Sequence, residues 1–422
     1  MHEDPVTARP PSGSEPLRIA LLAPPMVPVP PPGYAGTERI VAILAEELHR
    51  RGHRVTLFAS GDSEPPCELV PTVDRALWAT GYRGDVSAHI DLTLAKAWER
   101  HRDFDVIHSH VETGGFLFAR QCPTPVVTTL HGRLDVAGIP DLIDEFSDIA
   151  LVAISASQRR WWPDANWVAT IHHGLPLERV PFGRRAGRDL VLVGRIAREK
   201  GIQEAIELAR RTGRRLRLAA KVHDPDEQEL FDALVKPAIT DGLVDWKGEL
   251  PPAQRDPLLA SSLATLMLGA WPEPFGLVAI ESLATGTPVI ARHAGALPEI
   301  IEHGTDGFLV DDLDEAELAV RLVPKLDRER IRARALERFS VERMVDEYEA
   351  VYRRLAETGS GDGESRVASL PVGRWPVVVP VEPQSGIGSA VPAAPVTGRP
   401  GAGRSSVRLG SQRVVAPQEV AR

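Results

Sequence analysis

Short runs of apolar and β-branched residues alternate with longer amphipathic stretches from Leu17 to about Glu357. This alternation is typical of βαβ units around a parallel sheet. In the first unit, residues 17–25 (LRIALLAPP) predict a buried strand. Residues 37–53 predict a helix with Thr37 as its N-cap and Gly52 at its end. Residues 55–60 (VTLFAS) predict the next strand.

The same pattern then repeats in two series of strands that are separated by a polar passage at residues 182–188. Further strands are predicted at residues 105–110, 125–131, 150–155 and 168–174, and, in the second series, at residues 189–196, 215–222, 244–248, 262–269, 287–292 and 307–310. Helices are predicted at residues 312–323 and along residues 327–357. We therefore predict an α/β protein with two Rossmann-like domains, whose ligands bind beyond the carboxyl ends of the strands.

The predicted domains span residues 17–184 and 185–340, and a C-terminal helix follows at residues 341–357. Residues 1–16 and 358–422 lack the apolar periodicity of the rest and are rich in Pro, Gly, Ser and Ala. Segments of this composition cannot bury enough apolar surface to fold. We therefore predict a disordered leader and a disordered tail, which hold much of the proline of the chain.

The charge balance bears on the partners of the protein. The chain has 58 acidic and 49 basic residues, a net charge of −9, which disfavours nucleic acid or an anionic membrane as a bulk partner. An anionic ligand must then be held by local groups. Cys67 and Cys122 are too few for a disulfide framework and lack the spacing of a zinc site. We expect a cytoplasmic protein without a membrane-spanning helix.

Residues 271–301 (WPEPFGLVAIESLATGTPVIARHAGALPEII) hold the most informative motif. Glu273 precedes a Pro-Phe-Gly turn, and Glu281 lies eight residues further on, in a helix expected to begin near Gly276. The unpaired N–H groups of Phe275, Gly276 and Leu277 at that helix start suit the binding of hydroxyls or phosphates. From spacing alone, a solvated Glu281 beside an ordinary turn is an equally good interpretation.

The stretch EPFGLVAIE and the residues after it resemble the E-x7-E signature of the family 4 retaining glycosyltransferases, which adopt the GT-B fold. The resemblance extends over residues 17–357. It implies two domains facing across a cleft, a nucleotide-diphosphate-sugar donor bound mainly by the second domain, and an acceptor presented by the first. It also implies that the final helix crosses back to brace the first domain.

Roles follow by position from this resemblance. Glu273 would hydrogen-bond hydroxyls of the donor sugar, and Glu281 would bind the ribose hydroxyls. The N–H groups of Phe275, Gly276 and Leu277 would hold sugar and phosphate oxygens.

The segment VGRIAREKG, residues 193–201, contains Arg195 and Lys200 at the end of a predicted strand. The two resemble the family's Arg and Lys pair, which neutralises the donor diphosphate. Cations there stabilise the charge of the leaving group without a metal ion. Arg198 is an additional basic residue without an assigned role. The alternative interpretation is a solvated basic loop at a helix start.

The loop PPGYAGTE, residues 31–38, resembles the glycine-rich loop with which the family approaches the donor phosphates. Gly36 matches that pattern. Ala35 stands where the family usually has its first glycine, and alanine restricts positive φ and adds a methyl group.

Several histidines follow predicted strands. His131 resembles the family's strand-end histidine near the donor sugar and acceptor, the alternative being a structural histidine. His108, His110, His172 and His173 lack a partner at metal-ligand spacing, and we expect them to be structural or to line the cleft.

Residues 157–167 (SQRRWWPDANW) place three tryptophans beside two arginines. Such a mixture suits core packing, stacking on a sugar, or a peripheral contact with the inner face of a membrane.

We therefore predict a retaining glycosyltransferase that moves a sugar from a nucleotide-diphosphate-sugar donor to a hydroxyl of a sugar, glycolipid or small-molecule acceptor. We expect neither a metal ion nor a cofactor, and no nucleic acid partner. The alternatives are a nucleotide-sugar epimerase on the same fold and an inactive sugar-nucleotide-binding protein. The chain lacks the Gly-x-Ser-x-Gly, His-Glu-x-x-His and P-loop motifs, which disfavours the commonest hydrolases and NTPases.

Overall fold

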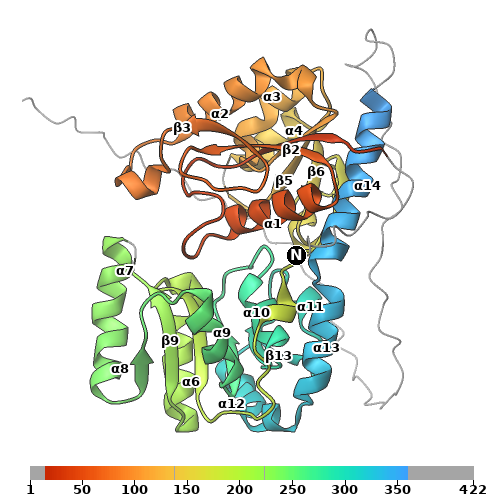
Figure 1. Cartoon of the computed structure of the whole chain (residues 1–422). Coiled ribbons are helices and arrows are strands. Elements are labelled where there is room, and N and C mark those ends of the chain that lie inside the picture. Colours follow the sequence, from red (N-terminus) through yellow and green to blue (C-terminus); the bar gives the residue numbers. More distant parts are fainter. Residues whose placement is uncertain (1–14, 137, 223, 360–422) are drawn as a thin grey trace, which may run out of the picture. The chain divides into compact units, whose positions relative to one another are not determined.

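Two parallel sheets organise the chain, as predicted (Figure 1). They are seen in a computed structural model that describes residues 15–136, 138–222 and 224–359. The predicted leader and tail lie outside the described residues, except for residues 15, 16, 358 and 359. The predicted domain boundaries stay predictions.

The first domain is built on a seven-stranded sheet with the order β3-β2-β1-β4-β5-β6-β7. Its strands are β1 (Arg18–Leu22), β2 (Arg54–Ser60), β3 (Glu68–Val73), β4 (Val106–Ser109), β5 (Val126–Leu130), β6 (Ala150–Ala153) and β7 (Trp167–Thr170). Its helices are α1 (Gly36–Arg50), α2 (Ser87–Glu99), α3 (Phe116–Gln121), α4 (Ile139–Glu145) and α5 (Ala156–Arg159). Neighbouring strands are parallel throughout.

The second domain has a six-stranded parallel sheet with the order β10-β9-β8-β11-β12-β13. Its strands are β8 (Leu190–Arg195), β9 (Leu216–Lys221), β10 (Val244–Trp246), β11 (Ala264–Met267), β12 (Val289–Arg292) and β13 (Gly307–Val310). Its helices are α6 (Ile202–Thr212), α7 (Pro225–Leu230), α8 (Lys236–Thr240), α9 (Pro252–Ala260), α10 (Leu277–Ala284), α11 (Leu297–Ile300), α12 (Leu313–Leu322) and α13 (Arg328–Arg338).

The strand order reverses between β1 and β4 in one sheet and between β8 and β11 in the other. In sheets of this kind, the crevice beyond the carboxyl ends of the strands at this reversal is where ligands bind. Every strand predicted from the sequence is present, and most have tighter bounds than predicted.

Two local predictions were incomplete or wrong. The sequence analysis missed β3, an edge strand whose residues ELVPTV include Pro71 and are mostly half-buried or exposed, so they do not give an apolar run. Thr37 is not the N-cap of α1. The helix begins one residue earlier, at Gly36, and Ala35 occupies the cap without a side-chain hydrogen bond. Gly52 follows the helix with φ +91°, as its predicted role at the helix end requires.

Residues 327–357 form two helices, and the chain crosses between the domains at their junction near Ser340. There Leu175 donates its N–H to the Phe339 carbonyl at 3.0 Å. Gly174 packs so close that a Cβ would lie 2.2 Å from the Ser340 carbonyl oxygen. The second helix, α14 (Val341–Gly359), contacts α1 and β4 of the first domain, which confirms the predicted brace (Figure 1).

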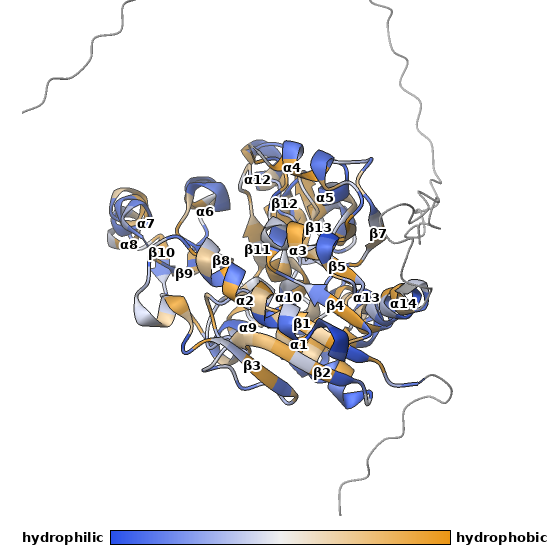
Figure 2. Ribbon diagram, turned by 90° about the horizontal axis from the view of Figure 1, so that it is seen from above, coloured by the Kyte–Doolittle hydropathy of each residue, from blue (hydrophilic) through white to orange (hydrophobic). Residues whose placement is uncertain are grey.

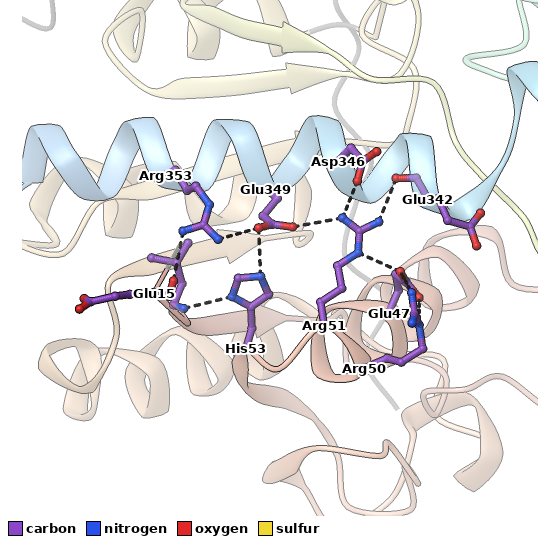
Figure 3. Close-up of polar contacts among 10 residues, drawn as sticks. Glu15, Glu47, Arg50, Arg51, His53, Glu342, Asp346, Glu349 and Arg353 are labelled. Atoms are coloured by element: carbon purple, nitrogen blue, oxygen red, sulfur yellow. Dashed lines mark hydrogen bonds and ion pairs between the residues drawn. The ribbon is translucent and has the colours of Figure 1, made fainter. Parts of the chain in front are cut away.

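An ion-pair network fastens α14 to the first domain (Figure 3). Arg51, just after α1, pairs with Glu47 at 2.8 Å on its own helix and with Asp346 and Glu349 on α14, at 2.5 and 3.1 Å. Glu349 also faces His53 at 3.4 Å. Both α1 and α14 carry polar and apolar residues (Figure 2), which fits helices that bury one face. No helix of the described ranges is both long and apolar enough to cross a membrane.

Candidate functional site

A cavity of about 200 Å³ lies between the two domains. Most of the residues singled out from the sequence line it. They are Gly36, His131, Lys200, Glu273, Phe275, Gly276 and Leu277. They come from the loop before α1, the end of β5, the turn after β8 and the start of α10. The fold therefore joins in one place motifs that are up to about 240 residues apart in the sequence.

Lys200 and Glu273 form an ion pair inside this cavity. Lys200 ends a short 3-10 turn that follows β8, and Glu273 lies in the loop between β11 and α10. Burial alone would lower the pKa of Lys200, but the neighbouring Glu273 carboxylate outweighs burial and leaves that pKa raised. The cavity therefore contains a fixed positive charge next to a carboxylate.

The turn that carries Glu273 depends on two glycines. Gly276 adopts φ +107° as the N-cap of α10, a conformation that residues with a Cβ rarely adopt, and it offers no capping side chain. The first amides of α10 are therefore not capped by a side chain at this position. A Cβ on Gly295 would lie 2.5 Å from the backbone N and O of Glu273. Glycine at that position thus lets the loop after β12 pack directly on the Glu273 backbone.

The structure does not bring Arg195 to the cavity wall. Its guanidinium pairs with Glu199 at 3.1 Å and with Glu227 at 3.1 Å. Glu199 itself lines the cavity. The predicted role of Arg195 beside Lys200 at the donor diphosphate stays a prediction.

Glu281 is also absent from the cavity wall, and its side chain is 2% exposed. Its carboxylate pairs with Arg255 at 2.7 Å and with Arg39 of α1, so this contact joins the two domains. Both arginines line a second cavity of about 230 Å³ that shares Gly36 with the first. Sequence reasoning missed Arg39 and Arg255, because neither lies near Glu281 in the chain.

The loop before α1 reaches the second domain. Tyr34 donates its N–H to the Glu249 carboxylate at 3.1 Å and lines both cavities. Ala35 has φ −154°, an extended conformation, so alanine at this position costs no backbone strain. A Cβ on Gly36 would lie 3.6 Å from the Leu277 side chain, so the loop approaches the start of α10 closely.

His131 is half-buried at the cavity, beside the buried histidines His110 and His173. Its Nε2 is 2.9 Å from Nδ1 of His110, and its ring stacks on His173 with 5.4 Å between the centroids. Burial lowers the pKa of His131 to about 3 and holds the pKa of His110 and His173 well below 6.5. These rings are therefore neutral at pH 7.

The other two histidines differ. His108 is fully buried, and its ring nitrogens lie 2.7 Å from the hydroxyl oxygens of Tyr352 and Thr129. It is therefore structural, which is one of the two roles expected for it. His172 pairs with Glu299 of the second domain at 3.0 Å. Across the described ranges, no three His, Cys, Asp or Glu side chains are arranged to hold a metal ion.

Glu112 was missed by the sequence analysis. It follows β4 in a left-handed conformation, with φ +53°, and its carboxylate accepts the N–H groups of His131 at 2.9 Å and Gly132 at 3.1 Å. Desolvation raises the pKa of Glu112 to about 7. The only signal in the sequence is an acidic residue directly after a predicted strand, beside two glycines.

The Trp-rich segment does not form a single surface. Trp167 is buried in β7 and donates its indole N–H to the Trp162 carbonyl at 2.6 Å, while Trp161 is 49% exposed. Trp162 packs against the core of the first domain. None of the three lines the cavity.

Both halves of the chain match models of known protein families. Residues 34–171 match the family model described as Glycosyltransferase Family 4, and residues 183–338 match the model described as Glycosyl transferases group 1. The D-inositol 3-phosphate glycosyltransferase of Frankia alni is 31% identical over 348 residues, 69% of this chain and 86% of that protein. That of Streptomyces scabiei is 28% identical over 366 residues, 72% and 82% of the two chains.

Solved structures agree with the fold. AviGT4, a glycosyltransferase involved in avilamycin A biosynthesis, superposes with a TM-score of 0.60 at 25% identity, covering 81% of this chain and 99% of that one. Sucrose-phosphate synthase from Thermosynechococcus elongatus gives 0.66 at 20% identity, with 81% and 100% covered. HepE of Anabaena in complex with UDP and glucose gives 0.63 at 18%, with 80% and 99% covered. The last two show a shared fold.

Proposed function

The chain belongs to glycosyltransferase family 4, and from that premise we propose that it transfers a sugar from a nucleotide-diphosphate-sugar donor to an acceptor hydroxyl with retention of configuration. The observation that carries the proposal is the shared cavity. Lys200, Glu273 and the start of α10 line one side of it, and His131 of the other domain lines it as well.

Charge complementarity supports this use of the cavity. The donor diphosphate would take the Lys200 ammonium and the amides at Phe275, Gly276 and Leu277, while sugar hydroxyls donate to the Glu273 carboxylate. A departing nucleoside diphosphate gains negative charge in the transition state, and a fixed cation beside a helix start stabilises that charge. No step of this scheme requires a metal ion.

The proton of the acceptor needs a base. We propose front-face substitution: the acceptor oxygen bonds to the anomeric carbon on the face from which the phosphate oxygen leaves, and that departing oxygen takes the acceptor proton. His131, neutral because burial lowers its pKa to about 3, would shape the sugar and acceptor side of the cavity. It would not supply an imidazolium acid at pH 7.

The comparisons suggest where to look for the substrates. Because the curated relatives are named D-inositol 3-phosphate glycosyltransferases, a phosphorylated cyclitol is the first acceptor to try, beside sugars and glycolipids. The family relationship does not identify the nucleotide base of the donor. We propose that side chains around the second cavity recognise this base. We propose a cytoplasmic site of action, where nucleotide sugars are made.

A thermal-shift screen against UDP-, GDP- and ADP-sugars tests donor binding. A donor at one hundred times its dissociation constant is expected to stabilise the protein by about 2.7 kcal/mol. The preferred donor is then incubated with and without acceptor, and the products are separated and their anomeric configuration is read by NMR. A retained glycoside that forms only with acceptor supports the proposal. Conversion of the donor without acceptor indicates an epimerase, and binding without any turnover indicates an inactive protein.

A further inference from the structure

The backbone of the turn that carries His131 is hydrogen-bonded by two side chains of the first domain. Glu112 accepts the N–H groups of His131 and Gly132 at 2.9 and 3.1 Å. The side-chain amide of Gln158 donates to the carbonyls of Leu130 and Gly132, both at 2.9 Å. Four backbone groups of three consecutive residues are therefore bonded by the half-buried Glu112 and the buried Gln158, which restrains the turn.

Backbone strain supports a functional interpretation of this arrangement. Within the described ranges, Glu112 is the non-glycine residue with positive φ, at +53°. Such a conformation persists only where the surroundings over-determine it, and it gathers at sites where geometry matters. Here it places the Glu112 carboxylate under the two amides of the His131 turn.

The second domain reaches the same turn through α5. Glu299 of α11 accepts the N–H groups of Ala156 and Ser157, the first two residues of α5, at 2.8 and 2.6 Å. The hydroxyl of Ser155, the N-cap of α5, donates to the Pro274 carbonyl of the second domain at 2.7 Å. Gln158 follows on the same short helix. A single turn of helix thus contacts the second domain at its start and the His131 turn through Gln158.

A second contact runs through side-chain rings. Phe275, next to the start of α10, packs edge-on against His173 with 4.9 Å between centroids. His173 in turn stacks on His131 at 5.4 Å. The second domain therefore supports both the backbone of the His131 turn and its ring.

We propose that Glu299 is a positioning residue for His131. Glu299 accepts hydrogen bonds from the first amides of α5 and so holds this helix and its Gln158 in place. Gln158 in turn holds the backbone of the turn from which His131 reaches the cavity. The effect of Glu299 on catalysis rests on the proposed function. Glu299 does not line the cavity, so the role assigned to it runs through α5. In this arrangement the contact between the domains adds to the restraint that Glu112 and Gln158 place on the His131 turn.

Amide hydrogen exchange of the full chain tests the link without any substrate. In Glu299→Gln, a neutral side chain that presents one acceptor oxygen instead of two, the amides of His131 and Gly132 are expected to exchange about tenfold faster than in the wild type. The matched control is Glu302→Gln, two residues after α11, whose carboxylate bonds Thr305 and Arg334 within its own domain. Equal exchange in Glu299→Gln, the control and the wild type would overturn the inference.

Gln158→Met provides a second, independent variant. It leaves the hydrogen bonds of Glu299 to α5 intact and removes the side-chain amide that bonds the carbonyls of Leu130 and Gly132. It is expected to raise exchange at the same two amides. Combining it with Glu299→Gln is expected to add little, because both changes break one chain of contacts. Fully additive effects on exchange contradict the coupling.

Kinetics then separates positioning from binding. Glu299→Gln is expected to lower kcat by about tenfold while the donor KM stays within about twofold, since the donor is held by Lys200 and Glu273. A rise in donor KM with unchanged kcat contradicts the inference. If the wild type transfers no sugar from any donor, the proposed function fails, while the exchange experiment still decides the structural link.

Discussion

At the scale of single residues, burial decides which groups around the cleft carry charge. Desolvation keeps His131 neutral at pH 7, and it raises the pKa of Glu112 to about 7. Lys200 remains charged, because Glu273 compensates for its burial. The net charge of −9 does not describe this local pattern, in which the Lys200 ammonium lies beside the carboxylate of Glu273.

Replacing Glu112 with Gln tests the buried carboxylate. The pKa of Glu112 is raised in the folded protein from an ordinary 4.5 to about 7, so its effect on stability is most favourable below pH 4.5 and is lost as pH rises through 7. A glutamine keeps an acceptor for both amides and cannot ionise. Relative to the wild type, Glu112→Gln is expected to gain about 3 kcal/mol of stability between pH 4.5 and pH 8.

Thermal unfolding of the two proteins across that pH range measures the difference. A constant gap in Tm at every pH would show that Glu112 does not change its protonation there.

The sequence motifs predicted several residues of the cavity. Lys200 and Glu273 were assigned from separate motifs to one ligand, and they meet in one cavity. Arg195 and Glu281 were assigned to the same ligand; they lie outside the wall of this cavity, where Arg195 pairs with Glu227 and Glu281 with Arg39, and their predicted roles stay predictions. Those partners lie on elements distant in the sequence, and no local pattern indicates which distant charge an arginine or glutamate will find.

At the scale of elements, apolar periodicity located the strands of both sheets, because buried parallel strands are continuous apolar runs. Apolar periodicity did not predict elements whose position depends on other interactions. The edge strand β3 contains a proline and polar positions, and the start of α1 is set by the loop that reaches Glu249 rather than by a capping side chain. The predicted brace, α14, was confirmed, and its buried face carries Tyr348 and Tyr352.

The brace is tested by Tyr352→Phe. The Tyr352 hydroxyl is buried and bonds Nδ1 of His108 at 2.7 Å, so its loss leaves a buried ring nitrogen unpaired. We expect a loss of about 1–3 kcal/mol in stability, seen as a lower Tm. The matched control is Tyr82→Phe, whose hydroxyl donates to Asp85 in an exposed turn, and it is expected to change stability by less than about 0.5 kcal/mol. Equal shifts in both variants would contradict the role of α14.

At the scale of the whole molecule, the GT-B fold follows from two similar sheets and a helix that returns to the first. Glu281, Glu299 and Ser155 contribute contacts between the domains. The sequence predicted that two domains would share a cleft, since the resemblance covers both. It did not predict these contacts, because each joins residues that are more than about a hundred positions apart and depends on how the folded domains meet.

The central claim is that sugar transfer takes place in the cavity lined by Lys200 and Glu273. The most direct measurement is the rate of glycoside formation from the preferred donor by Lys200→Ala and Glu273→Ala, beside Lys236→Ala, which removes an exposed lysine of α8 that pairs with Asp232. We predict a loss of about 100-fold or more in the two cavity variants and an unchanged rate in the control. Transfer at the wild-type rate in both cavity variants would contradict the account.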